Sequence, residues 1–82
     1  MSEQVNATIK HIGAVIRDLR LSFDWTQRKL AEKAGIAEPS LSQIENGRNP
    51  SLETLNSIAL ALGRHPYEIL WLAGPRSGNS VA

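Results

Sequence analysis

The stretch from residue 26 to residue 50, TQRKLAEKAGIAEPSLSQIENGRNP, constrains the fold more than any other part of the chain. Thr26 can cap a helix, because its hydroxyl can accept a hydrogen bond from an unpaired amide of the first turn. Gly35 suits the left-handed backbone that often ends a helix. Leu41 and Ile44 are three residues apart, so they share one face of a second helix. The stretch therefore predicts two short helices joined by a tight turn.

Signals typical of helices also precede and follow this stretch. Before this stretch, apolar residues recur in steps of three and four, at Ile9, Ile12, Ile16, Leu19 and Phe23. Gly13 either weakens that helix or lets a neighbouring element approach it. After the stretch, Ser51 can cap a fourth helix, and Pro66 can occupy the first turn of a fifth, where its missing N–H is not needed. The sequence predicts an all-α fold of five helices, the second and third over about 26–34 and 38–46.

The length of 82 residues, 41% of them hydrophobic, suffices for one small domain with a single core. We expect a short flexible arm over 1–7, the folded domain over 8–73, and a disordered tail over 74–82, where Gly and Ser are frequent. Seven apolar side chains should be buried together in the core: Ile16, Leu30, Ala31, Leu41, Ile44, Leu55 and Ile58.

Composition argues against several classes of protein. The chain contains no cysteine, and its two histidines, His11 and His65, have no ligand partners at metal spacing, so we expect no metal and no cofactor. No Ser-His-Asp set or phosphate-binding glycine loop indicates an enzyme, and no small-molecule ligand is evident. No apolar run reaches the ~18 residues of a membrane span, and the polar N-terminus is not a secretory signal. A cytoplasmic protein is the expectation.

The chain resembles a known family in the order and spacing of TQ, LA, AG, LSQIENG, PSL and ALG. It is similar to the lambda-repressor-like (Cro/XRE) helix-turn-helix proteins of bacteria and phages over about residues 9–72. The resemblance implies a five-helix domain whose third helix enters the major groove of double-stranded DNA with its N-terminal half. The net charge of only +1 is a weak electrostatic footprint for such a role.

Four outward positions of the third predicted helix are candidates for reading bases: Glu38, Pro39, Ser42 and Gln43. Gln43 is the best of them, because its amide can bond adenine N6 and N7 together. Ser42 can contact a base or a phosphate. Glu38 can accept from cytosine N4 or can complement the helix dipole, and both interpretations stay open. Pro39 departs from the family pattern: it offers only apolar contact, and the helix can start there with Ala37 or Glu38 as a poor cap.

The resemblance also implies residues that position the protein on phosphates: Gln27, Asn46 and Arg48. Gln27 falls where a helix N-terminus presents free amides to an anion. Asn46, followed by Gly47, can serve equally as a plain C-terminal turn.

An ion pair between Arg20 and Glu45 is implied by the same resemblance. If the pair is partly buried, it fixes the recognition helix against the first helix. The alternative is two unrelated surface charges.

The last predicted helix, PYEILWLAG, is more apolar than one helix end needs. We expect Ile69, Trp71 and Leu72 to form a dimer interface, with a fold-back of Trp71 over the core as the alternative.

The leading hypothesis for the function is a transcriptional regulator of Cro-like repressor type. Because one motif buries little surface, we expect it to bind a palindromic operator as a homodimer. The alternative is a protein-interaction module or antitoxin-type adaptor with the same fold.

Overall fold

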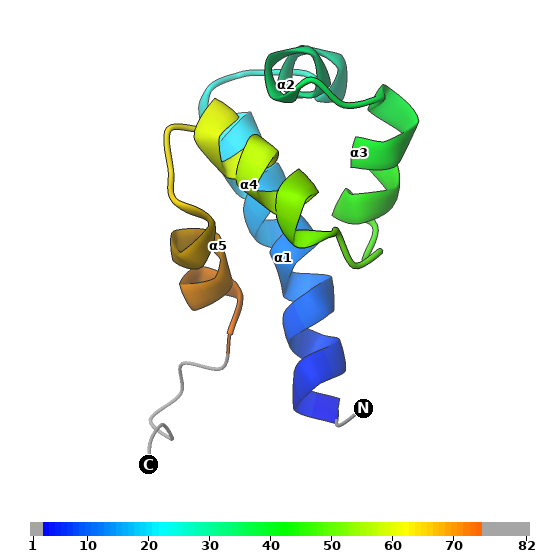
Figure 1. Cartoon of the computed structure of the whole chain (residues 1–82), viewed down its shortest axis with the longest axis vertical. Helices are drawn as coiled ribbons and strands as arrows, with labels where there is room; N and C mark the ends of the chain where they lie inside the picture. Colours follow the sequence, from blue (N-terminus) through cyan, green and yellow to red (C-terminus); the bar gives the residue numbers. More distant parts are fainter. Residues whose placement is uncertain (1–2, 75–82) are drawn as a thin grey trace.

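The computed structural model describes residues 3–74 of the chain, which form five helices and no strand. The helices are α1 (Glu3–Ser22), α2 (Gln27–Ala34), α3 (Glu38–Glu45), α4 (Leu52–Ala61) and α5 (Pro66–Ala73). In Figure 1, α1 and α4 occupy the centre, α2 lies across their upper end, and α3 and α5 lie on opposite sides. This arrangement confirms the all-α, five-helix prediction.

The predicted helix ends are present where local chemistry defines them. The Thr26 hydroxyl accepts a hydrogen bond from the backbone N–H of Lys29 at 3.0 Å, which satisfies an amide of the first turn of α2. Gly35 follows α2 with φ at 72°, the left-handed region that favours glycine. The Ser51 hydroxyl caps α4 in the same way, by accepting from the N–H of Thr54.

The start of α1 differs from the prediction. The helix begins at Glu3, so the expected arm over 1–7 is wrong for residues 3–7. No Gly or Pro lies between Glu3 and Ile9 to stop the helix, and a negative charge in the first turn suits the helix dipole. The expected boundary followed the apolar stripe, but this helix continues beyond its buried stripe and projects past the other helices (Figure 1). Of the predicted tail, Gly74 ends α5, and residues 75–82 lie outside the described part.

The core is built from all five helices. It contains the seven predicted side chains together with Ile12, Ala59, Leu62, Ile69 and Ala73. Ile69 is fully buried, so its expected place in a dimer interface is wrong. The structural reason is that α5 packs on both α1 and α4 and must turn one apolar face inward.

Gly13 sets the distance between α1 and α3. A Cβ atom at this position would lie 2.1 Å from the backbone oxygen of Ile44, closer than atoms can approach. Of the two roles open for Gly13, the close approach of a neighbour is therefore the one observed. The glycine lets the C-terminal end of α3 pack directly on α1, which fixes the distance between these two helices.

Candidate nucleic-acid interface

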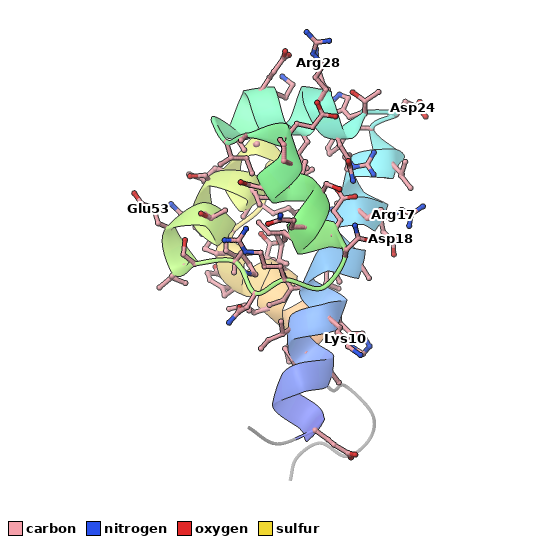
Figure 2. All side chains as sticks on the ribbon, turned by 90° about the vertical axis from the view of Figure 1, so that its right-hand side faces the viewer. Lys10, Arg17, Asp18, Asp24, Arg28 and Glu53 are labelled. Atoms are coloured by element: carbon pink, nitrogen blue, oxygen red, sulfur yellow. The ribbon has the colours of Figure 1, made fainter. Side chains whose placement is uncertain are left out.

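The amphipathic pattern of α3 turns its polar face away from the core. Leu41 and Ile44 are buried beneath it. Figure 2 looks onto this side of the molecule, with α3 in front and α2 above it. Three of the four predicted base-reading residues are exposed, namely Glu38, Pro39 and Gln43. The fourth, Ser42, is half-buried. The structure therefore brings all four predicted readers to α3, on the part of the helix that the core leaves accessible.

The first turn of α3 has little capping of its own. Ala37 occupies the cap position with extended backbone and makes no side-chain bond, and Pro39 lies in the first turn. Of the possible poor caps, the structure selects Ala37. Proline is tolerated here because first-turn amides have no partner within the helix. Glu38 is the acidic residue of this first turn, the end of a helix where a negative charge suits the dipole.

The last turn of α3 closes in a Schellman motif, in which two amides beyond the helix bond back to its carbonyls. The N–H of Gly47 donates to the carbonyl of Ile44 at 3.0 Å, and the N–H of Arg48 donates to the carbonyl of Gln43 at 3.0 Å. Gly47 has φ at 110°, which only glycine adopts readily. The Asn46 side chain donates to the carbonyl of Ser42 at 2.9 Å. Asn46 thus acts as a helix-terminating residue, and its phosphate role stays a prediction.

Gln43 and Arg48 are joined side chain to side chain. The Nη1 group of Arg48 donates to Oε1 of Gln43, and both residues are exposed. The sequence pattern separated these residues into a base reader and a phosphate contact. In the structure, this bond holds the two side chains together at the C-terminal end of α3.

Arg20 and Glu45 form the predicted ion pair. Arg20 donates from Nε to Oε2 of Glu45 at 2.8 Å and from Nη2 to Oε1 at 2.9 Å. A third bond runs from Nη1 of Arg20 to the carbonyl of Trp25 at 2.8 Å. Arg20 is 7% exposed, and its hydrogen bond to Glu45 raises its pKa above the ordinary value. This bidentate ion pair joins α3 to the end of α1 and fixes the orientation of the two side chains as well as their distance.

Gln27 joins this network, which sequence reasoning did not predict. Its Nε2 group donates to Oε1 of Glu45 at 3.0 Å. The side-chain NH2 carries two N–H groups, so this bond uses one of them. The predicted phosphate role therefore has to act through a side chain already held by α3. No signal in the sequence predicted this bond, because Gln27 and Glu45 lie on different helices and helical periodicity does not encode contacts between helices.

Charges of both signs surround the interface. Lys10, Arg17 and Arg28 carry the labelled positive charges in Figure 2, and Asp18, Asp24 and Glu53 the negative ones. The Arg28 guanidinium lies 3.5 Å from the Glu32 carboxylate on the surface of α2, a contact of little energetic weight in solvent. With a net charge of +1, individual contacts rather than a broad positive field must carry any affinity for DNA.

The outer face of α5 is a second exposed feature. Four large side chains, which we name the α5 patch, are exposed on this helix: Tyr67, Leu70, Trp71 and Leu72. Trp71 is 70% exposed, so it does not fold back over the core. The patch lines a hollow of about 650 Å³ together with Arg64 and Glu68. The helix α5, which carries the patch, lies on the opposite side of α1 and α4 from α3 (Figure 1).

Residues 3–74 show neither a cluster of metal-ligating side chains nor a helix long and apolar enough to cross a bilayer.

Known proteins share this arrangement. A family model described as helix-turn-helix matches residues 16–69. An uncharacterised HTH-type transcriptional regulator of Mycobacterium tuberculosis is 43% identical over 61 residues, covering 73% of this chain and 43% of the regulator. The immunity repressor protein of Bacillus phage phi105 is 45% identical over 53 residues, covering 63% of this chain and 37% of the repressor. The restriction-modification controller protein C.AhdI from Aeromonas hydrophila has a similar structure, with a TM-score of 0.71 and 31% identity, covering 74% of this chain and 94% of that chain.

The fold and the exposed face of α3 define a helix-turn-helix domain of the DNA-binding type. The chain belongs to the Cro/XRE-type helix-turn-helix family, whose named members here are transcriptional regulators and phage repressors. It spans less than half the length of the mycobacterial regulator and the phage repressor.

Proposed function

We propose that this protein is a transcriptional regulator that binds a palindromic DNA operator as a homodimer, with α3 in the major groove. The observation that carries the proposal is the rigid presentation of α3. Its buried side is held by the core, its C-terminal end rests on α1 through Gly13, and Glu45 is fixed by Arg20 and Gln27. A helix that must match base edges needs such a fixed orientation, because each base contact depends on geometry.

In this proposal the residues of α3 and the residues that flank it have different tasks. The exposed first turn, with Glu38 and Pro39, and the later residues Ser42 and Gln43 face the base edges. The half-buried Gln27 and the loop with Asn46 and Arg48 contact the phosphates on either side. Each phosphate neutralised by a positive side chain releases counterions, so affinity should fall as salt rises. A plot of the logarithm of the binding constant against the logarithm of the salt concentration should fall with a slope of about 0.9 per contact.

The α5 patch supplies the contact between two copies. An exposed apolar patch on so small a domain is typical of an interaction surface. Its rim carries Arg64 and Glu68, whose charges are opposite and lie 3.6 Å apart. Around a two-fold axis, residue i of one copy meets residue j of the other, so Arg64 can also face Glu68 of a second copy. A dimer through this patch leaves α3 uncovered, because the helices α5 and α3 lie on opposite sides of α1 and α4 (Figure 1).

A dimer also explains how a weakly charged domain can bind tightly. Two linked readers engage two half-sites in one event, so their free energies of binding combine. Two recognition helices about 34 Å apart match one turn of the duplex. Because bacterial and phage regulators bind DNA in the cytoplasm, a cytoplasmic location is part of this proposal.

A gel-shift assay on random genomic fragments at two salt concentrations tests the proposal. We expect most complexes to disappear at the higher salt and a small set to persist, because base contacts depend less on salt than phosphate contacts do. Gln43→Ala should lose the persistent set. Asn56→Ala, which removes an exposed amide on α4, should keep it. If no fragment is shifted at either salt, the alternative of a protein-interaction module, which the α5 patch would serve, replaces the proposal.

A further inference from the structure

We propose that Arg48 determines base specificity by orienting the side chain of Gln43. It holds the carbonyl oxygen of Gln43, so that the NH2 group is presented to the major groove. Gln43 then reads a hydrogen-bond acceptor on the base edge, on guanine or thymine, rather than adenine. This inference rests on the proposed function and names the base class that the same site selects.

The backbone places Arg48 over Gln43. In a Schellman motif, the residue two places beyond the helix cap lies against the third residue from the helix end, and an apolar contact usually joins them. Here those two residues are Arg48 and Gln43, and their backbones are bonded N–H to carbonyl at 3.0 Å. A polar bond between side chains takes the place of the usual apolar contact. The orientation of Gln43 is therefore built into the way α3 ends.

The chemistry of arginine fixes which end of the Gln43 amide faces it. A guanidinium has five N–H donors and no acceptor, so only the oxygen of a carboxamide can bond to it. The oxygen and the NH2 group are the two branches of one planar group. When Arg48 holds the oxygen on one side, the NH2 group is directed to the other, and Gln43 presents donors.

Donors select particular base edges. In the major groove guanine offers the acceptors O6 and N7, and thymine offers O4. Adenine pairs best with a glutamine that donates to N7 and accepts from N6, which needs the oxygen of the amide as well. Reading adenine would compete with Arg48 for that oxygen. The sequence-based expectation of an adenine reader is thus replaced by that of a guanine or thymine reader.

Arg48 keeps donors for the DNA backbone. Its Nη1 group serves Gln43, and the other N–H groups of the guanidinium can meet a phosphate. Arg48 is therefore both a phosphate contact and a positioning residue. Its loss should change which base is preferred as well as how tightly all sequences bind.

The test compares three variants with the wild type. Arg48→Met removes the donor and keeps the length of the side chain, and Gln43→Ala removes the reader. Arg28→Met removes an exposed arginine of α2 whose partner is Glu32, so it controls for the loss of one charge. Competition binding at fixed salt would use duplexes that carry each of the four base pairs at every position of the preferred site.

We expect the wild type to prefer guanine or thymine roughly tenfold at one position, the usual discrimination of a good base contact. Arg48→Met should lose that preference, as Gln43→Ala does, or turn it to adenine, whereas Arg28→Met should keep it. A uniform loss in Arg48→Met with the preference intact would overturn the inference, as would an adenine preference in the wild type. A wild type that distinguishes no duplexes would instead overturn the proposed function, and this inference with it.

A measurement without DNA provides a second check. In the free protein, the NMR signals of the Gln43 side-chain amide should shift in Arg48→Met and stay in place in Arg28→Met. Unchanged Gln43 signals in Arg48→Met would mean that the two side chains are not bonded in solution, and the inference would fall.

Discussion

Arg20 and Glu45 show how single residues fix the orientation of α3. Both are nearly buried, with side-chain exposures of 9% and 3%. Their charges are held by two direct bonds and by further bonds to Trp25 and Gln27. A buried pair of this kind adds little to stability over an apolar pair of similar size, but losing one partner leaves an unpaired charge inside the protein. We infer that the pair serves orientation more than stability.

Glu45→Leu should therefore lower the free energy of unfolding by about 3 kcal/mol, because it leaves the Arg20 charge buried without its partner. The double variant Arg20→Met, Glu45→Leu should recover much of that loss. Urea unfolding of the wild type, both single variants and the double variant measures the coupling between them. Additive losses would show that the two residues act independently.

Gly13→Ala tests the close packing of α1 and α3, because the sign of the change in the free energy of unfolding distinguishes an ordinary helix position from a crowded one. In an ordinary helix, replacing glycine by alanine stabilises the protein by about 1 kcal/mol. Here the added Cβ would meet the backbone oxygen of Ile44 at 2.1 Å. We expect a loss of about 1–3 kcal/mol, as for other overpacked sites, together with weaker DNA binding because α3 is displaced. A raised melting temperature would contradict the close packing of α1 and α3.

At the scale of elements, the sequence was most informative where local chemistry decides the structure. Thr26, Gly35 and Ser51 end or begin helices through bonds or backbone angles that depend on neighbouring residues alone. The start of α1 could not be placed, because no residue there stops a helix and the apolar stripe begins later. The bonds from Gln27 to Glu45 and from Arg48 to Gln43 depend on side-chain reach across a fold, which periodicity does not encode.

The start of α5 makes one contribution to stability sensitive to pH. The Glu68 carboxylate accepts a hydrogen bond from the backbone N–H of His65 at 2.8 Å. That bond, helped by the nearby charge of Arg64, lowers the pKa of Glu68 below its ordinary value of 4.5. A group whose pKa is lowered by folding stabilises the protein above its unfolded pKa, and this contribution is lost as the pH falls through the folded pKa.

Glu68→Gln should therefore melt at a lower temperature than the wild type near neutral pH, and the difference should shrink as the pH falls below about 4.5. Thermal unfolding followed by circular dichroism across this range measures it. A difference that stays constant with pH would mean that the charge of Glu68 plays no part in capping α5.

At the scale of the whole molecule, the two exposed faces differ in the chemistry of their side chains. The α3 face carries polar side chains held by hydrogen bonds, and the α5 patch carries exposed apolar side chains. The helices α3 and α5 lie on opposite sides of α1 and α4 (Figure 1). Sequence reasoning found the excess of apolar residues on α5 but assigned Ile69 to the wrong face, because a helix of eight residues gives few positions from which to determine its buried side.

Trp71→Glu tests the role of the α5 patch. The variant should keep its helical circular dichroism, because Trp71 is exposed, but become monomeric by light scattering and lose affinity for its operator. Leu52→Glu is the matched control, since Leu52 is 73% exposed on α4 outside the patch, and it should remain dimeric. A Trp71→Glu protein that still binds DNA as a dimer would place the interface elsewhere, and one that unfolds would place Trp71 in the core.

Selection of bound sequences from a random pool of duplex DNA tests most directly whether the protein binds a palindromic operator as a dimer. We expect enrichment of an inverted repeat whose half-site centres lie about ten base pairs apart, one turn of the duplex, as two α3 helices related by a two-fold axis require. A pool that shows no enriched motif after repeated rounds would contradict sequence-specific DNA binding, and an enriched single half-site would contradict the dimer.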